Sequence, residues 1–182
     1  MNDGAVTASE TMRSSTPRIL LTLCCLLFTF AAACSDSPPT PTLGPVVGNV
    51  APPFETALLT GDTISLDELR GNGVIVNFWA TWCAPCIREL PLLNKVAREH
   101  SADGLTVLAI NMGEAEDTIV EFLDEFDLGF PVALDRQGEI AGSYGVLGLP
   151  MSFFIDRKGV VRYRRIGELM VDHVTRGLER IN

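Results

Sequence analysis

Two cysteines near the middle of the chain, Cys83 and Cys86, have the spacing of a reactive thiol pair. They follow an apolar run at 74–80 and precede residues of helical periodicity, so both sulfurs should lie in the first turn of a helix. Free N–H groups and the positive end of the helix dipole stabilise a thiolate there, and the pKa of the first cysteine in such pairs commonly falls to about 3.5–7.5. The sequence therefore predicts thiol–disulfide exchange, with Cys83 as the attacking thiol and Cys86 as the resolving thiol.

The other cysteines do not compete with this interpretation. Cys24, Cys25 and Cys34 lie in or just after an apolar N-terminal run. One close pair cannot form a framework of several disulfides, and a zinc site would need two further ligands that neither histidine supplies at ligand spacing. We therefore predict a redox-active disulfide in the globular part of the chain, no bound metal and no other cofactor.

The N-terminal segment has the features of a secretory signal. An apolar run at 19–33 follows Arg13 and Arg18 and is shorter than the roughly 18–20 apolar residues of a transmembrane helix. A basic flank, a short apolar core and small residues at its end are typical of an export signal. Translation from Met12 would give a cleaner signal than translation from Met1.

Three alanines followed by Cys34 resemble the lipobox of bacterial lipoproteins, in which the cysteine is acylated and becomes the mature N-terminus. We expect a lipoprotein-type signal peptide at 1–33, a tether rich in Pro, Ser and Thr at 34–46, and one globular domain at 47–182. The alternatives are an uncleaved anchor or an ordinary signal. In each case the domain should lie on the periplasmic or other extracytoplasmic side of the cell membrane.

The order of elements from residue 47 predicts an α/β domain with a central mixed sheet flanked by helices. A small hairpin is expected around the turn at 60–62, and the acidic run at 114–117 is expected to cap the helix that follows it. The strands are expected at 74–80, 105–111, 131–134, 152–155 and 160–165, and the helices at 83–100, 118–126, 139–144 and 171–181. The formal net charge of −9 argues against nucleic acid or an anionic membrane surface as a partner.

Residues 47–181 resemble the thioredoxin superfamily, and more narrowly the exported thiol–disulfide oxidoreductases of the TlpA/ResA type. The resemblance implies a thioredoxin-like fold with an N-terminal hairpin and an inserted helix–strand unit at about 114–134. It rests on APPF at 51–54, NFWATWCAPC at 77–86, Glu89, Pro91, LAIN at 108–111, YGVLGLP at 144–150 and FFIDRKG at 153–159.

The resemblance also assigns roles around the cysteine pair. Glu89, one helical turn after Cys86, is implied as a catalytic proton carrier, because thioredoxin has a buried aspartate where this chain has Asn77. Pro150 is implied to form a cis-proline loop. Leu149 would then offer backbone groups to an extended client, and Trp82 would form part of the docking surface. The expected substrate-binding residues are therefore Trp82, Leu149 and Pro150.

Family resemblance implies a monomeric, membrane-tethered reductant of exported protein disulfides such as apocytochrome c, supplied with electrons by a membrane donor of the DsbD/CcdA type. A disulfide oxidase of the same fold is an alternative. A thiol peroxidase is disfavoured because Thr81 precedes Cys83 by two residues rather than three. A Cu(I) chaperone is disfavoured because the loop at Pro150 has no histidine, only Met151 as a soft ligand.

Overall fold

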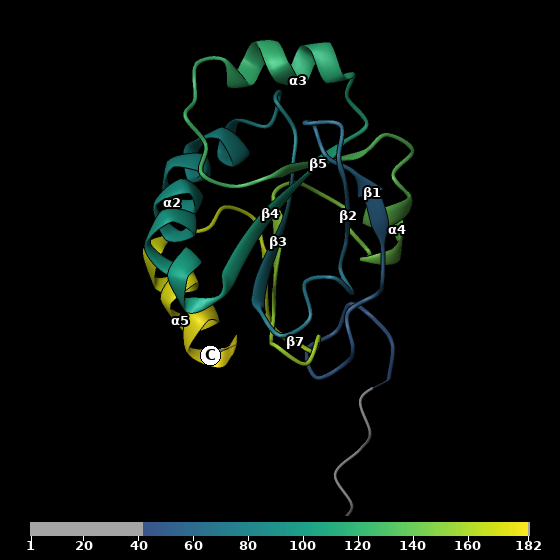
Figure 1. The fold of residues 1–182 in the computed structure, drawn as a ribbon, viewed down its shortest axis with the longest axis vertical. Coiled ribbons are helices and arrows are strands. Elements are labelled where there is room, and N and C mark those ends of the chain that lie inside the picture. Colours follow the sequence, from purple (N-terminus) through teal and green to yellow (C-terminus); the bar gives the residue numbers. More distant parts are fainter. Residues whose placement is uncertain (1–41, 182) are drawn as a thin grey trace, which may run out of the picture. The chain divides into compact units, whose positions relative to one another are not determined.

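A computed structural model describes residues 42–181 (Figure 1). The predicted signal peptide and Cys34 lie outside the described residues. The segment at 42–46, placed in the tether by its composition, is already bonded to the domain, since the Val50 N–H donates to the Thr42 carbonyl oxygen at 2.8 Å. Between residues 42 and 181 no helix is both long and apolar enough to cross a membrane.

The centre of the domain is a mixed sheet of five strands in the order β5-β4-β3-β6-β7. The first three of these run parallel to one another, whereas β6 and β7 are antiparallel additions on the other side of β3. Every residue of β3 is buried, as its unbroken apolar sequence predicts for a central strand covered on both faces. The strands are β3 (Gly73–Trp79), β4 (Leu105–Met112), β5 (Val132–Asp135), β6 (Met151–Ile155) and β7 (Val161–Ile166).

Helices cover both faces of the sheet, as predicted (Figure 1). Side chains of α2 and α5 share one apolar core with the first face, and side chains of α4 share a second core with the other face. The hairpin of β1 (Glu55–Ala57) and β2 (Thr63–Ser65) also packs on the second core. The helices are α2 (Ala84–His100), α3 (Glu116–Leu123), α4 (Glu139–Ser143) and α5 (Val171–Ile181), with a 3-10 turn η1 (Ser101–Asp103) after α2.

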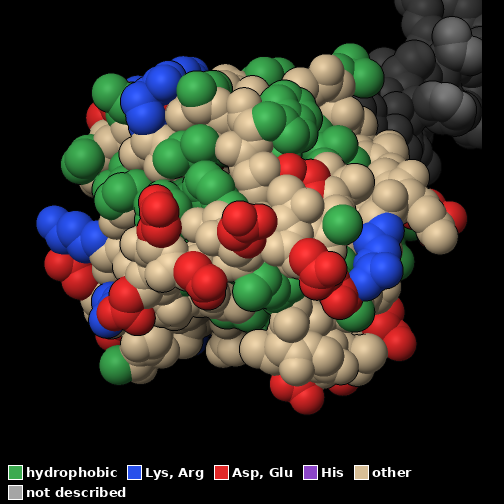
Figure 2. All heavy atoms as spheres, turned by 90° about the horizontal axis from the view of Figure 1, so that it is seen from above, with side chains coloured by type: hydrophobic (Ala, Val, Ile, Leu, Met, Phe, Trp, Pro, Cys, Tyr) green, Lys and Arg blue, Asp and Glu red, His purple; other side chains and the backbone are tan. Residues whose placement is uncertain are grey.

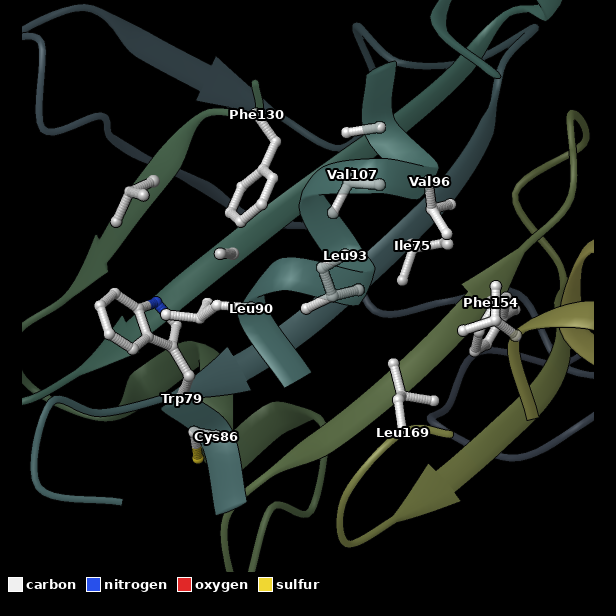
Figure 3. Packing of buried hydrophobic residues seen from close by; sticks show 14 of the residues in the cluster. Ile75, Trp79, Cys86, Leu90, Leu93, Val96, Val107, Phe130, Phe154 and Leu169 are labelled. Atoms are coloured by element: carbon white, nitrogen blue, oxygen red, sulfur yellow. The ribbon is translucent and has the colours of Figure 1, made fainter. Parts of the chain in front are cut away.

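The first core fixes the helix that carries the cysteines. Leu90 and Leu93 of α2 are fully buried, and Figure 3 shows Leu90 beside the Trp79 ring at the end of β3. On the same face α5 lies very close to β6. A Cβ atom added at Gly177 of α5 would lie only 2.3 Å from the ring of Phe154 in β6, so only glycine fits at this contact. Tight packing of this kind holds both helices at fixed positions over the sheet.

Strand register decides which loops share an edge of the sheet. In the antiparallel pair of β3 and β6, Val74 lies opposite Ile155 at one end and Phe78 lies opposite Met151 at the other. The loop after β3, which leads to Cys83, therefore meets the loop before β6. The opposite edge of the sheet contains the turn between β6 and β7.

Candidate active site

The two cysteines lie where the sequence predicts, at the N-terminus of α2. Cys83 is the N-cap residue, and its Sγ accepts the Cys86 N–H at 3.3 Å. The two sulfurs form a disulfide with an S–S distance of 2.01 Å. Cys83 is 4% exposed and Cys86 is 0% exposed, so the sulfur predicted to attack is the one nearer to solvent.

The sequence around the pair explains this local geometry. The Cys83 N–H donates to the Ala80 carbonyl oxygen at 3.2 Å, which closes a turn between β3 and α2. Pro85 stands in the first turn of α2, where its missing N–H costs no helical hydrogen bond. Trp82 is 71% exposed beside the disulfide, whereas Trp79 is buried in the core. Trp82 is thus available for docking, the role that the resemblance implies for it.

The loop before β6 has the conformation that the resemblance implies. The peptide bond between Leu149 and Pro150 is cis. The Pro150 carbonyl oxygen accepts the Gly167 N–H at 2.8 Å, so this loop is also tied to the segment after β7. Pro150 is buried and Leu149 is half-buried. Leu147 in the same loop is fully exposed, a feature that sequence analysis did not single out.

Glu89 is buried on the inner side of α2, one helical turn after Cys86, with only 1% of its surface exposed. Its Oε1 accepts from Asn77 Nδ2 at 2.7 Å, and its Oε2 accepts from the Leu169 N–H at 2.5 Å. The same Asn77 nitrogen donates to Ser152 Oγ at 2.9 Å. Asn77 thus takes part in the carboxyl site as the donor that orients Glu89.

Burial raises the pKa of Glu89 from 4.5 to about 7, because the charged carboxylate loses its hydration. The hydrogen bonds from Leu169 and Asn77 lower this pKa but do not offset burial, while Glu168 raises it slightly and Arg165 lowers it slightly. A carboxyl group with a pKa near neutral can both accept and release a proton at physiological pH. Its place one turn after Cys86 fits the predicted proton carrier.

Glu114 also belongs to this end of the domain, although the sequence suggested a helix-capping role for the acidic run at 114–117. Its carboxylate accepts the Thr81 N–H at 2.8 Å, the Thr81 hydroxyl at 2.5 Å and Asn111 Nδ2 at 2.7 Å. It therefore holds the residue that begins the turn into α2. Glu116 and Asp117 do lie in the first turn of α3, where negative charge is favourable.

Replacing Glu114 by glutamine should lower the unfolding free energy of the disulfide form by about 1–3 kcal/mol, because an amide cannot accept all three hydrogen bonds. Urea unfolding would measure this change. Glu116→Gln is the matched control, since Glu116 is an exposed carboxylate paired with Arg136, and its loss should change stability by less than about 0.5 kcal/mol. Equal losses in the two variants would contradict the positioning role of Glu114.

The described residues contain no group of three or more His, Cys, Asp or Glu side chains placed to hold a metal ion. The site brings together the Cys83–Cys86 disulfide, a buried carboxyl group of near-neutral pKa one helical turn after Cys86, and a cis-proline loop at the same end of the sheet. A thioredoxin-like fold with this site defines a thiol–disulfide oxidoreductase.

Comparison with known proteins gives the same class. The AhpC/TSA family model matches residues 47–164. The thiol-disulfide oxidoreductase ResA of Geobacillus kaustophilus is 38% identical over 135 residues, which span 74% of this chain and 78% of that protein. The chain belongs to the AhpC/TSA family, and within this thioredoxin-like family it is of the TlpA/ResA type.

Solved structures extend this comparison. A thiol:disulfide interchange protein DsbE from Chlorobium tepidum has a TM-score of 0.70 and 32% identity, covering 75% of this chain and 99% of that chain. The exposed lipoprotein thioredoxin Etrx1 of Streptococcus pneumoniae has a TM-score of 0.64 and 28% identity, covering 70% of this chain and 98% of that chain. Together these relatives confirm the predicted fold and the redox class.

Proposed function

We propose that the protein is a membrane-tethered reductase of disulfides in exported proteins, apocytochrome c among them, and that a membrane donor of the DsbD/CcdA type returns it to the dithiol state. The observation that carries this proposal is the position of the disulfide. Cys83, the less buried of the two sulfurs, lies at the N-terminus of α2, at the end of the sheet where the cis-proline loop enters β6.

Two features of this edge favour a polypeptide client over a small thiol. The backbone of Leu149 can pair with an extended segment, as in recognition by strand addition. Trp82 and Leu147 expose large apolar side chains from the two loops of this edge. Apolar side chains exposed around a reactive group are typical of a protein-binding surface.

The reaction balances over the two cysteines and the client disulfide. The Cys83 thiolate attacks one client sulfur, and the other client sulfur leaves as a thiolate. The Cys86 thiolate then attacks Cys83 Sγ, which releases the second client thiolate and closes the disulfide seen in the structure. The client gains two electrons and the dithiol loses two. Glu89 would take the proton from Cys86 as its thiolate forms.

Attachment to the membrane through a lipid on Cys34 rests on the lipobox-like sequence. The Streptococcus pneumoniae relative is described as an exposed lipoprotein, which favours the same arrangement here. In this proposal the domain faces the periplasm or another extracytoplasmic space and works as a monomer.

The direction of electron flow is tested by equilibrium of the protein with reduced and oxidised glutathione. Tryptophan fluorescence is the readout, because Trp82 directly precedes Cys83 in the sequence. A reductase should have a potential near that of thioredoxin, about −270 mV. A potential near about −120 mV, as in DsbA, would contradict the reductase and support the oxidase alternative. Cys83→Ser, which cannot form the disulfide, is the control for signals unrelated to it.

A further inference from the structure

The basic side chains of the domain are unevenly paired. Between residues 42 and 181 there are twelve lysines and arginines, and seven of them form ion pairs with carboxylates. The other five have no carboxylate partner within this part of the chain. All five lie on the β6–β7 hairpin or in the last turn of α5: Arg157, Lys158, Arg164, Arg165 and Arg180.

The contacts of these side chains leave their charge largely uncompensated. Arg157 and Arg164 each donate to a backbone carbonyl oxygen, and the guanidinium group of Arg180 lies 5.3 Å from the centre of an aromatic ring. Arg165 is not counted with the other four residues, because its positive charge lowers the pKa of the Glu89 carboxyl group. The remaining four residues are exposed and are called the basic surface here: Arg157, Lys158, Arg164 and Arg180.

The start of the described chain lies against this surface. The Gly48 N–H donates to the Val161 carbonyl oxygen at 2.8 Å, and the Val161 N–H donates to the Asn49 carbonyl oxygen at 2.9 Å. Val47 and Arg180 also line one open hollow of about 490 Å³, together with the ion-paired Asp156 and Arg162. This N-terminal segment exposes three apolar side chains beside the basic surface: Leu43, Val46 and Val47.

The turn of the basic hairpin lies on the sheet edge away from the disulfide, because β6 ends at Ile155 opposite the beginning of β3. Figure 1 shows the β7 hairpin and the first described residues at one end of the domain and α3 at the other. Figure 2, viewed from the α3 end, shows Asp and Glu side chains spread over that face. The domain thus has an acidic end and an end with uncompensated positive charge.

Chain length limits how far the basic surface can lie from a lipid on Cys34. The eight residues from Cys34 to Thr42 span at most about 29 Å when fully extended. A short tether of this kind raises the effective concentration of a surface to the millimolar range, so even a weak affinity for the bilayer is sufficient for binding.

We propose that the basic surface and Leu43, Val46 and Val47 form a contact for anionic phospholipids, which holds the domain with the Cys83–Cys86 disulfide directed away from the bilayer. The arginines and lysine would bind headgroup phosphates, and the apolar side chains would enter the interface. This inference rests on the proposed lipid attachment at Cys34. The net charge of −9 argues against binding to an anionic membrane, but that total does not describe the local positive charge of the basic surface.

The test uses the full chain, lipidated in a bacterial host and reconstituted in vesicles. One vesicle population contains phosphatidylglycerol with phosphatidylcholine and the other phosphatidylcholine alone. Energy transfer from the protein tryptophans to a dansyl-labelled headgroup reports the distance of the active-site end, because Trp79 and Trp82 are the two tryptophans of the chain. We expect low transfer on anionic vesicles and higher transfer on neutral vesicles.

The triple variant Arg157→Gln, Lys158→Gln, Arg164→Gln should give the neutral-vesicle value on anionic vesicles. Each basic residue near an anionic surface contributes about fivefold, so the ratio of bound to free orientations should fall on the order of 100-fold. The matched control removes three charges that are ion-paired elsewhere and should behave as the wild type: Lys95→Gln, Arg136→Gln and Arg176→Gln.

Equal transfer on both vesicle types, or equal loss in both triple variants, would overturn the inference while leaving the proposed function intact. If the wild type fails to float with the vesicles, the lipid attachment is wrong and the inference falls with it. Disulfide reduction by the same samples tests the catalytic proposal separately, and it should be unchanged in both variants because neither alters the site.

Discussion

Replacing Cys83 by serine is expected to remove all disulfide reduction, whereas replacing Cys86 by alanine is expected to preserve the first step and accumulate a mixed disulfide with the client. The two variants should differ because only Cys83 occupies the N-cap position of α2. Cys83 is the N-cap residue, its Sγ accepts a backbone N–H, and it is the sulfur nearer to solvent. A thiolate in that position is stabilised, and a serine hydroxyl is a far poorer nucleophile.

The two variants are compared by reduction of a protein disulfide in solution and by trapping in cells. Non-reducing gels of the Cys86→Ala variant should show client-linked species that disappear on addition of dithiothreitol. The double variant Cys83→Ser, Cys86→Ala is the matched control and should trap nothing. Stable conjugates formed by Cys83→Ser alone would show that Cys86 attacks first, contrary to the assignment.

Most of the fold could be predicted from the sequence because its signals are local. The unbroken apolar run of β3, the helical periodicity after Cys83 and the turn residues at 156–159 each predict an element, and the observed bounds differ from the predicted ones by at most three residues. The cis bond at Pro150 was different, since local physics gives only a small preference for it and the family resemblance was needed.

What the sequence could not show is contact between distant segments. The N–H of Leu169 lies 80 residues from Glu89, and the carboxylate of Glu114 lies 33 residues from Thr81. Both pairs meet because strand register brings the loops after β3, β4 and β7 to one edge of the sheet. An acidic residue in a loop gives no sign of such a partner, so Glu114 could be placed only with the structure.

The same register separates the two ends of the molecule. The exposed side chains of Trp82 and Leu147 lie at the end of the sheet where β3 ends, whereas the turn of the basic hairpin lies where β3 begins. If that turn binds lipid, clients approach the disulfide from the aqueous side. A lipid tether alone would attach the domain but would allow its active site to turn toward the bilayer. The basic surface would in addition hold the active site away from the bilayer.

The buried carboxyl group of Glu89 should make the stability of the disulfide form depend on pH. Below about pH 4.5 the group is protonated in both the folded and the unfolded chain. Between 4.5 and about 7 the folded protein holds one proton more than the unfolded chain, so the unfolding free energy falls as the pH rises. The full loss, complete above about pH 7, is about 3 kcal/mol, since one pKa unit corresponds to about 1.4 kcal/mol.

Glu89→Gln removes this titration and keeps a side chain of nearly the same shape. Relative to the wild type it should gain about 3 kcal/mol of unfolding free energy between pH 4.5 and 8, measured by urea unfolding of the disulfide form. Glu99→Gln is the matched control, because Glu99 is an exposed carboxylate on the same helix. Parallel pH profiles for wild type and Glu89→Gln would contradict a raised pKa at this site.

The same substitution separates stability from catalysis. If Glu89 takes the proton of Cys86, the rate of the resolving step should fall by about 10²-fold in Glu89→Gln and lose its inflection near pH 7. The first attack by Cys83 should change little. A gain in stability together with a slower resolving step is an outcome that a merely structural glutamate would not produce, because removal of a structural group affects folding alone. Single-turnover kinetics over a range of pH would resolve the two steps.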